Sequence, residues 1–164
     1  MMLPPMHGKC DQDKFFIYAA ADRRYFDLHG KALINSVCAN TPEYGVHMHI
    51  YDPTLDQIKF CKDTPGVSVT YENLDAVPFN EITDYWLTRT EFDNDRQRQM
   101  AKKGRNLGEK ELTKLIRQTY YACVRFIRLA AILDKDQQCL AIDVDGLVRG
   151  SFDIALGDCD FYLY

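Results

Sequence analysis

Short apolar segments alternate with segments of helical spacing along most of the chain. Segments with the length and apolar content of strands are residues 15–20, 46–52, 67–74, 139–143 and 160–164. Helices are predicted between them, at residues 24–40, 53–62 and 109–134. Strands that alternate with helices form a mostly parallel sheet flanked by helices. The pattern therefore predicts a single α/β domain over residues 1–164.

Two of these elements show their period clearly. In residues 46–52 apolar side chains alternate with His47, His49 and Tyr51, which is the period of a strand. His47 and His49 are therefore expected on a polar face, turned to solvent rather than to a ligand. The helix at 109–134 is predicted from apolar residues three and four apart: Leu112, Ile116, Tyr120, Cys123, Ile127 and Ala131.

Residues 75–108 interrupt the pattern. They are polar and aromatic and have no sustained period, so they are predicted to form a long loop or insertion with a helical turn. Trp86, with Tyr85, is a candidate to stack on a sugar, and a local hydrophobic anchor is the alternative. The basic stretch from Arg96 to Arg105 is broken by uncharged residues and is interpreted as a solvated loop.

Composition narrows the class of protein. The chain has 164 residues and a net charge of −4, so no overall basic field favours nucleic acid. No apolar run approaches the roughly 20 residues of a membrane span, and the first ten residues lack the apolar core of a signal peptide. The six cysteines form no CxxC pair or zinc cluster, which favours reduced thiols in a cytoplasmic protein.

The segment LAIDVDGLVRG, residues 140–150, carries the clearest chemistry. Asp143 and Asp145 follow an apolar strand and precede Gly146, so both carboxylates can converge on one cation. Hard divalent ions prefer oxygen ligands, and Mg²⁺ is often held by one or two carboxylates together with substrate phosphates. A second copy of the spacing, Asp158 and Asp160, is interpreted as a solvated turn.

Two enzyme families place an apolar strand before such a motif. In haloacid dehalogenase phosphatases the first Asp is a nucleophile and the motif opens the fold. Here only residues 147–164 follow, and Leu147 stands where that family usually has Thr. The phosphatase remains a remote alternative.

The order of segments resembles the GT-A glycosyltransferases, most closely family eight, the galactosyltransferase and glycogenin group. FFIYAAADRRYFDLHGKALINSVCAN is similar to their first strand, Ala-Ala-Asp turn and following helix, which has a Ser near its end. VHMHIYD resembles their second strand. YYACVRFIRLAAIL followed by CLAIDVDGLVRGSFD resembles their helix and DxD segment. The resemblance implies a GT-A, Rossmann-like sheet that would end after the DxD strand, and a glycosyltransferase that takes a nucleotide sugar, with UDP-sugar as the expected donor.

Matching positions assign the expected donor contacts. The backbone around Ala20 and Ala21, with Asp22, would hold the base and ribose, and Tyr25 would pack nearby. Arg125 would approach the donor diphosphate. The two acidic residues of the motif, Asp143 and Asp145, would contact Mn²⁺ or Mg²⁺, and Asp143 would also reach the ribose.

Each assignment has a structural alternative. Asp22 is also a preferred N-cap for the helix that follows it. Tyr25 is equally consistent with core packing. Arg125 is also consistent with a structural partner of the aspartates. For Asp143 and Asp145, the alternative is that they are ordinary turn residues.

The expected machinery for sugar transfer is incomplete. In the family, the segment after the DxD strand supplies the acceptor site and a further metal ligand, whereas this sequence ends soon after Gly146. Two hypotheses follow: a donor-binding domain of a glycosyltransferase, or a module that binds a nucleotide sugar or a partner protein without catalysis. A sheet edge left exposed would favour a homodimer through that edge.

Overall fold

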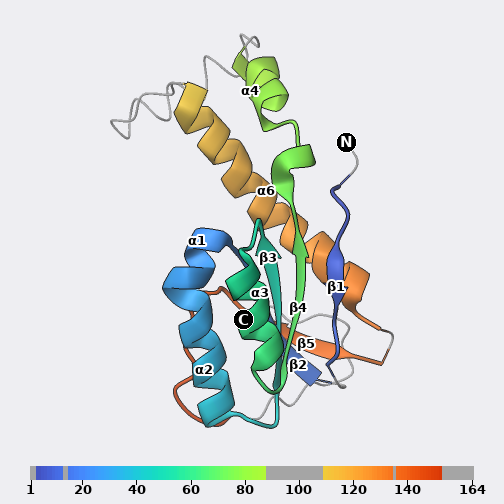
Figure 1. The fold of residues 1–164 in the computed structure, drawn as a ribbon, viewed down its shortest axis with the longest axis vertical. Helices are drawn as coiled ribbons and strands as arrows, with labels where there is room; N and C mark the ends of the chain where they lie inside the picture. The colour runs from blue at the N-terminus through green and yellow to red at the C-terminus, as the bar shows by residue number, and fades with distance from the viewer. Residues whose placement is uncertain (1–2, 13–14, 88–108, 135, 153–164) are drawn as a thin grey trace.

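A computed structural model describes residues 3–12, 15–87, 109–134 and 136–152 (Figure 1). It confirms an α/β fold with a mostly parallel sheet and flanking helices. The predicted strand at 160–164 and the second acidic pair, Asp158 and Asp160, lie outside the described residues. No described helix is long and apolar enough to span a membrane.

The sheet has the strand order β1-β4-β3-β2-β5. Its strands are β1 (His7–Lys9), β2 (Phe15–Asp22), β3 (Gly45–Tyr51), β4 (Val67–Glu72) and β5 (Gln138–Ala141). β2 pairs in parallel with β3 on one side and with β5 on the other, and β4 continues the parallel order beyond β3. β2 is therefore the strand at which the direction of winding changes.

Helices cover both faces of this sheet. The first crossover contains α1 (Arg23–Tyr25), a π-helical segment η1 (Phe26–Gly30) and α2 (Lys31–Asn40), and the second contains α3 (Leu55–Asp63). The third contains η2 (Leu74–Ala76), α4 (Phe79–Leu87) and α6 (Glu109–Ile132). Figure 1 shows α1, α2 and α3 in front of the sheet and α6 behind it.

Two hydrophobic clusters correspond to these two faces. One joins Leu33 and Val37 of α2 and Ile58 of α3 to the strand residues Met48 and Ile50. The other is built from Tyr51, Leu74, Val77, Phe79, Tyr120 and Val124. Because each face has its own helix layer, the central strands are buried on both sides.

The edge strand β1 was not predicted. It is three exposed residues, His-Gly-Lys, with none of the apolar content that marks a strand. It pairs antiparallel with β4, and Gly8 has φ of 81°. A Cβ atom at Gly8 would lie 2.3 Å from the Val69 carbonyl oxygen, so this close backbone approach requires glycine.

The expectation that His47 and His49 face solvent is wrong. Both side chains have 0 % exposure. His47 contacts the Ser68 hydroxyl at 2.7 Å and the Thr70 hydroxyl at 2.8 Å, and His49 contacts the Thr70 hydroxyl at 3.0 Å. The alternation is real, but the polar side of β3 lies beneath α6. There hydroxyl groups contact both imidazole nitrogens of His47 and the Nδ1 atom of His49, whereas the buried His49 Nε2 atom has no hydrogen-bond partner among the described residues.

The loop or insertion with a helical turn that was predicted over 75–108 contains more helix than expected, at residues 79–87. These residues form α4, a helix longer than a single turn, which packs against α6. The Thr83 hydroxyl contacts the Thr113 hydroxyl of α6 at 3.0 Å. Residues 88–108, including the stretch from Arg96 to Arg105, lie outside the described residues, as does the side chain of Trp86.

The long helix is confirmed as α6, but its buried positions differ from the predicted pattern. Leu112, Tyr120, Val124 and Arg128 are buried at intervals of four or eight residues. The apolar residues Cys123, Ile127 and Ala131 are exposed. From Tyr120 onward, the buried residues of α6 are therefore four positions apart, and the last of them is the charged Arg128.

Candidate functional site

β5 ends opposite Tyr18 of β2, at the place where the sheet changes its winding direction, and β2 continues to Asp22. The chain leaves β2 toward β3 on one side, whereas β5 lies on the other side of β2. In open α/β sheets, ligands bind outside the carboxyl ends of the strands at such a switch point. Asp22 is the last residue of β2, and Asp143 follows the end of β5 by two residues. The fold thus brings two of the predicted site residues to the place where a ligand is expected.

Arg125 and Asp143 form an ion pair at this switch point. The Arg125 Nη1 atom lies 2.5 Å from the Asp143 Oδ1 atom, with side-chain exposures of 30 % and 72 %. The Tyr18 hydroxyl donates a 2.8 Å hydrogen bond to the Arg125 carbonyl oxygen, which joins this turn of α6 to β2. The Arg125 Nε atom is buried and has no hydrogen-bond partner among the described residues. The guanidinium therefore retains a donor for a further acceptor.

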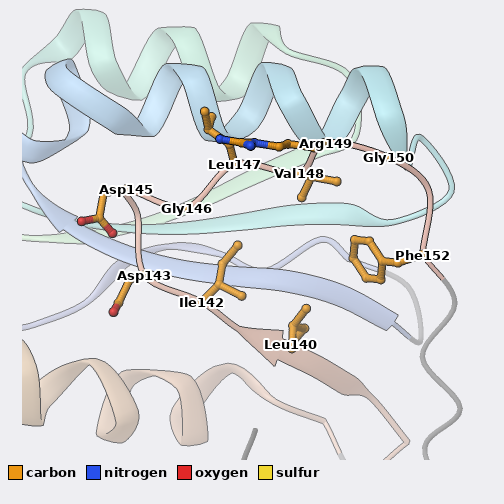
Figure 2. A pocket seen from close by; sticks show the side chains of 10 residues that line it. All are labelled: Leu140, Ile142, Asp143, Asp145, Gly146, Leu147, Val148, Arg149, Gly150 and Phe152. Atoms are coloured by element: carbon orange, nitrogen blue, oxygen red, sulfur yellow. The ribbon is translucent and has the colours of Figure 1, made fainter.

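The acidic pair sits on a short turn that is anchored to the protein core. Val144, between the two aspartates, is 6 % exposed and belongs to the cluster beneath α2 and α3. The Gly146 amide donates to the Asp143 carbonyl oxygen at 2.9 Å and closes the turn. In Figure 2 the Asp143 side chain points toward α6, while that of Asp145 lies higher on the turn. Burial of Val144 leaves both carboxylates on the outer side.

Residues of α2 hold the segment that follows this turn. The Val148 amide donates to the Ser36 hydroxyl at 3.0 Å, and the Asn40 side-chain amide donates to the Val148 carbonyl oxygen at 2.8 Å. Ser36 is the serine near the helix end noted in the sequence. Asn40 was not singled out, because its partner is 108 residues away along the chain.

The residues at the end of β2 take three different environments. Ala21 is buried in the core, whereas Ala20 lines a cavity of about 170 Å³ together with Tyr18, Arg125 and Asp143. The Asp22 carboxylate accepts a 2.8 Å hydrogen bond from the Tyr25 amide, so it caps α1 as the structural alternative expected. Its second oxygen leaves capacity for a ligand.

Tyr25 is on the surface rather than in the core. Its side chain is 49 % exposed, and its ring centroid lies 5.6 Å from that of His29. An exposed aromatic ring at the carboxyl edge of a sheet offers a flat apolar surface to a base or sugar.

A cavity of about 590 Å³ lies between β5 and the segment that follows the acidic turn (Figure 2). Its lining combines the apolar side chains of Leu140, Ile142, Val148 and Phe152 with three polar groups. Those polar groups are the carboxylates of Asp143 and Asp145 and the guanidinium of Arg149. The acidic turn therefore separates this apolar cavity from the smaller one beside Arg125.

A larger groove of about 710 Å³ lies between α1 and α6 and was not predicted. It is lined by Asp22, Arg24, Tyr25, Leu28, His29, Asn80, Lys110, Thr113, Lys114, Arg117, Gln118 and Tyr121. The basic residues of α6 recur at helical spacing, and that spacing was the available signal.

The described residues fit a divalent cation only in part. They contain no group of three or more His, Cys, Asp or Glu side chains that could hold a metal ion. Asp143 and Asp145 supply carboxylate oxygens on a shared turn, but Arg125 already pairs with one of them. A cation would thus need phosphate oxygens from a ligand to complete its coordination, as Mg²⁺ often does.

Comparisons with protein families, with curated proteins and with solved structures find no match to this chain.

Proposed function

We propose that the chain is the donor-binding domain of a metal-dependent glycosyltransferase with a GT-A-like fold, and that UDP-sugar is its donor. The observation that carries the proposal is the position of two carboxylates, those of Asp143 and Asp145, just beyond the carboxyl end of β5 at the switch point of the sheet, with Arg125 beside them. A basic side chain and two carboxylates beside a switch point suit a ligand with a diphosphate and a bound cation.

The individual contacts follow from the positions of the side chains. Asp22 and Tyr25 would hold the base and ribose at the end of β2, with the backbone of Ala20 and Ala21 forming the floor. Arg125 would use its unpaired Nε donor for a phosphate oxygen. The diphosphate would then compete with Asp143 for the guanidinium and release that carboxylate.

Mn²⁺ or Mg²⁺, held by Asp143, Asp145 and the diphosphate, would neutralise the diphosphate and stabilise it as a leaving group. Asp145 has no ion pair among the described residues, so its carboxylate is available to such a cation. Binding of the donor and of the cation would consequently depend on each other.

A binding module without catalysis is the second candidate. The observation that favours it is the 2.5 Å pairing of Arg125 with Asp143, which already neutralises half of the acidic pair. Metal-dependent hydrolysis of UDP-glucose or UDP-galactose separates the two candidates, because a module without catalysis binds the donor and leaves it intact.

Calorimetric titration of UDP, with Mn²⁺ and then with EDTA, tests the donor site. Binding is expected with Mn²⁺, and Asp143→Ala combined with Asp145→Ala should weaken it by about tenfold or more and remove the metal dependence. Asp56→Ala combined with Asp63→Ala removes the same charge from exposed positions of α3 and should leave binding unchanged. Equal binding of UDP by the protein with Mn²⁺ and with EDTA would contradict the proposal.

A further inference from the structure

The groove between α1 and α6, defined above by its twelve lining residues, is strongly basic. Four permanent cations line it: Arg24, Lys110, Lys114 and Arg117. The opposing charge within the lining is a single carboxylate, that of Asp22. The whole chain has a net charge of −4, so the groove runs against the average charge of the protein. Cations gathered around a concave surface attract an anionic ligand more strongly than isolated surface lysines do.

Side-chain contacts hold part of this charge in place. The Arg117 guanidinium lies 4.6 Å from the centre of the Phe79 ring of α4, a cation–π contact that orients it. Across the groove, the Gln57 side-chain amide donates to the Arg23 carbonyl oxygen at 2.8 Å and ties α1 to α3. The two walls are therefore connected to the cores on opposite faces of the sheet.

The acidic and basic parts of the groove are separated. Asp22 ends β2 and is followed by Arg24 and Tyr25 of α1, whereas the other three cations, Lys110, Lys114 and Arg117, come from the first half of α6. Burial raises the pKa of the Tyr121 hydroxyl, and the nearby Asp22 carboxylate adds to this rise, so Tyr121 lies between the two parts as a neutral side chain. Thr113, Asn80 and Gln118 add polar groups to the basic part.

The basic part leads toward the proposed donor site. Arg117, Tyr121 and Arg125 are spaced four residues apart and thus follow one face of α6. Arg125 is the residue paired with Asp143. A ligand anchored on the lysines can consequently extend along this face to the position where the donor diphosphate would lie.

We propose that this groove binds the sugar acceptor, and that the acceptor is a small molecule carrying two or more phosphate groups. The role of the ligand as an acceptor rests on the proposed function. The binding of a phosphorylated ligand rests only on the charges of the groove. In the transfer, an acceptor hydroxyl oxygen bonds to the anomeric carbon of the donor sugar. The bond from that carbon to the diphosphate breaks, UDP leaves with the electron pair, and the hydroxyl proton passes to water.

Inorganic tripolyphosphate is a probe for the groove, titrated into the protein in EDTA by calorimetry. Binding is expected without a metal, and Lys110→Glu combined with Lys114→Glu should weaken it by about tenfold or more. Lys59→Glu combined with Lys62→Glu makes the same charge change at exposed positions of α3, outside the groove, and should change the affinity by less than about twofold.

Two outcomes would overturn the binding site itself. One is no tripolyphosphate binding in EDTA. The other is equal loss of affinity in the two lysine pairs, which would show a response to net charge and not to the groove. Asp143→Ala combined with Asp145→Ala should leave tripolyphosphate binding intact, so the groove can bind this probe even if the donor proposal fails.

The lysine variants also test the assignment to an acceptor. Lys110→Glu combined with Lys114→Glu is expected to change the affinity for UDP in Mn²⁺ by less than about twofold, because the donor occupies Asp22, Tyr25 and the acidic turn. A loss of UDP affinity as large as the loss of tripolyphosphate affinity would show that the basic residues belong to the donor site, and would overturn the assignment to an acceptor.

Discussion

Buried polar side chains form a continuous set of contacts between the sheet and α6. Glu72 of β4 has 0 % exposure, accepts a 2.8 Å hydrogen bond from the Tyr120 hydroxyl, and pairs with the Arg128 guanidinium. Arg128 also donates to the Pro4 carbonyl oxygen at 2.6 Å. His49 lies 3.9 Å from the same carboxylate. At the scale of single residues, hydrogen bonds and an ion pair hold α6 against the sheet, in addition to apolar packing.

Removing one member of the buried pair should be costly. Arg128→Met leaves the Glu72 carboxylate buried without its cation, and the free energy of unfolding should fall by about 3–5 kcal/mol. Adding Glu72→Gln to Arg128→Met removes the unpaired charge and should restore part of that loss. Urea unfolding followed by circular dichroism measures both, and a loss below about 1 kcal/mol in Arg128→Met would contradict the prediction.

The two buried histidines should make the fold sensitive to acid. Burial lowers the pKa of His47 to about 4 and that of His49 to about 3. The nearby Arg128 cation further lowers the pKa of His49. The unfolded chain therefore binds more protons than the folded protein below its ordinary histidine pKa of about 6.5. Their contribution to stability is complete above pH 6.5 and is lost as the pH falls toward about 4 for His47 and about 3 for His49.

The expected slope is about 1.4 kcal/mol per pH unit for each histidine within that window. Urea unfolding between pH 4 and pH 7 measures it, and His47→Gln should remove about half of the slope. His7→Gln, a histidine substitution at an exposed position of β1, serves as the comparison. A flat profile in the unmodified protein would show that the histidines are not buried as neutral groups.

At the scale of elements, each crossover is held by contacts at its ends. The helix α3 begins with a capping box, in which the Thr54 hydroxyl accepts from the Gln57 amide and the Gln57 side chain accepts from the Thr54 amide. The acidic turn is held by Ser36 and Asn40 of α2, and α6 is held by the Tyr18 hydroxyl. The elements that carry the candidate site are thus fixed by long-range hydrogen bonds.

The β1 edge depends on one glycine. Gly8→Ala would bring a Cβ atom to 2.3 Å from the Val69 carbonyl oxygen at φ of 81°, so β1 must separate from β4 or shift. The free energy of unfolding should fall by about 1–3 kcal/mol. Gly66→Ala is an informative comparison because its φ is 74° but nothing lies within 4 Å, which leaves only the backbone strain. Equal losses in the two variants would show that the close contact at β1 contributes nothing.

At the scale of the whole molecule, strand order creates the candidate site. β2 lies between β3 and β5; Asp22 is its last residue, and Arg125 pairs with Asp143 just beyond the end of β5. The groove and the two cavities all contain a residue of this edge. Donor and acceptor sites, as proposed, would share one end of the sheet and α6 would contact both.

Much of this architecture was predictable from local patterns. Apolar runs bounded by turn residues located β2, β3, β4 and β5, and helical spacing located α2, α3 and α6, because these signals arise within a few residues of sequence. The ion pair between Arg125 and Asp143 agrees with one of the two alternatives for Arg125, that of a structural partner of the aspartates. The three-residue strand β1 and the helix α4 were missed, since one is exposed and polar and the other lies in a segment without sustained period.

By itself, the sequence determined the class of the fold and the acidic turn after an apolar strand, and it offered the capping of α1 by Asp22 as one alternative. Each of these depends on neighbouring residues. Only the tertiary structure decided that His47 and His49 are buried, that Arg125 meets Asp143, and that four cations of α1 and α6 line one groove. These features depend on which elements pack together and at what register, and side chains distant along the chain become neighbours only when the sheet and its helices have assembled.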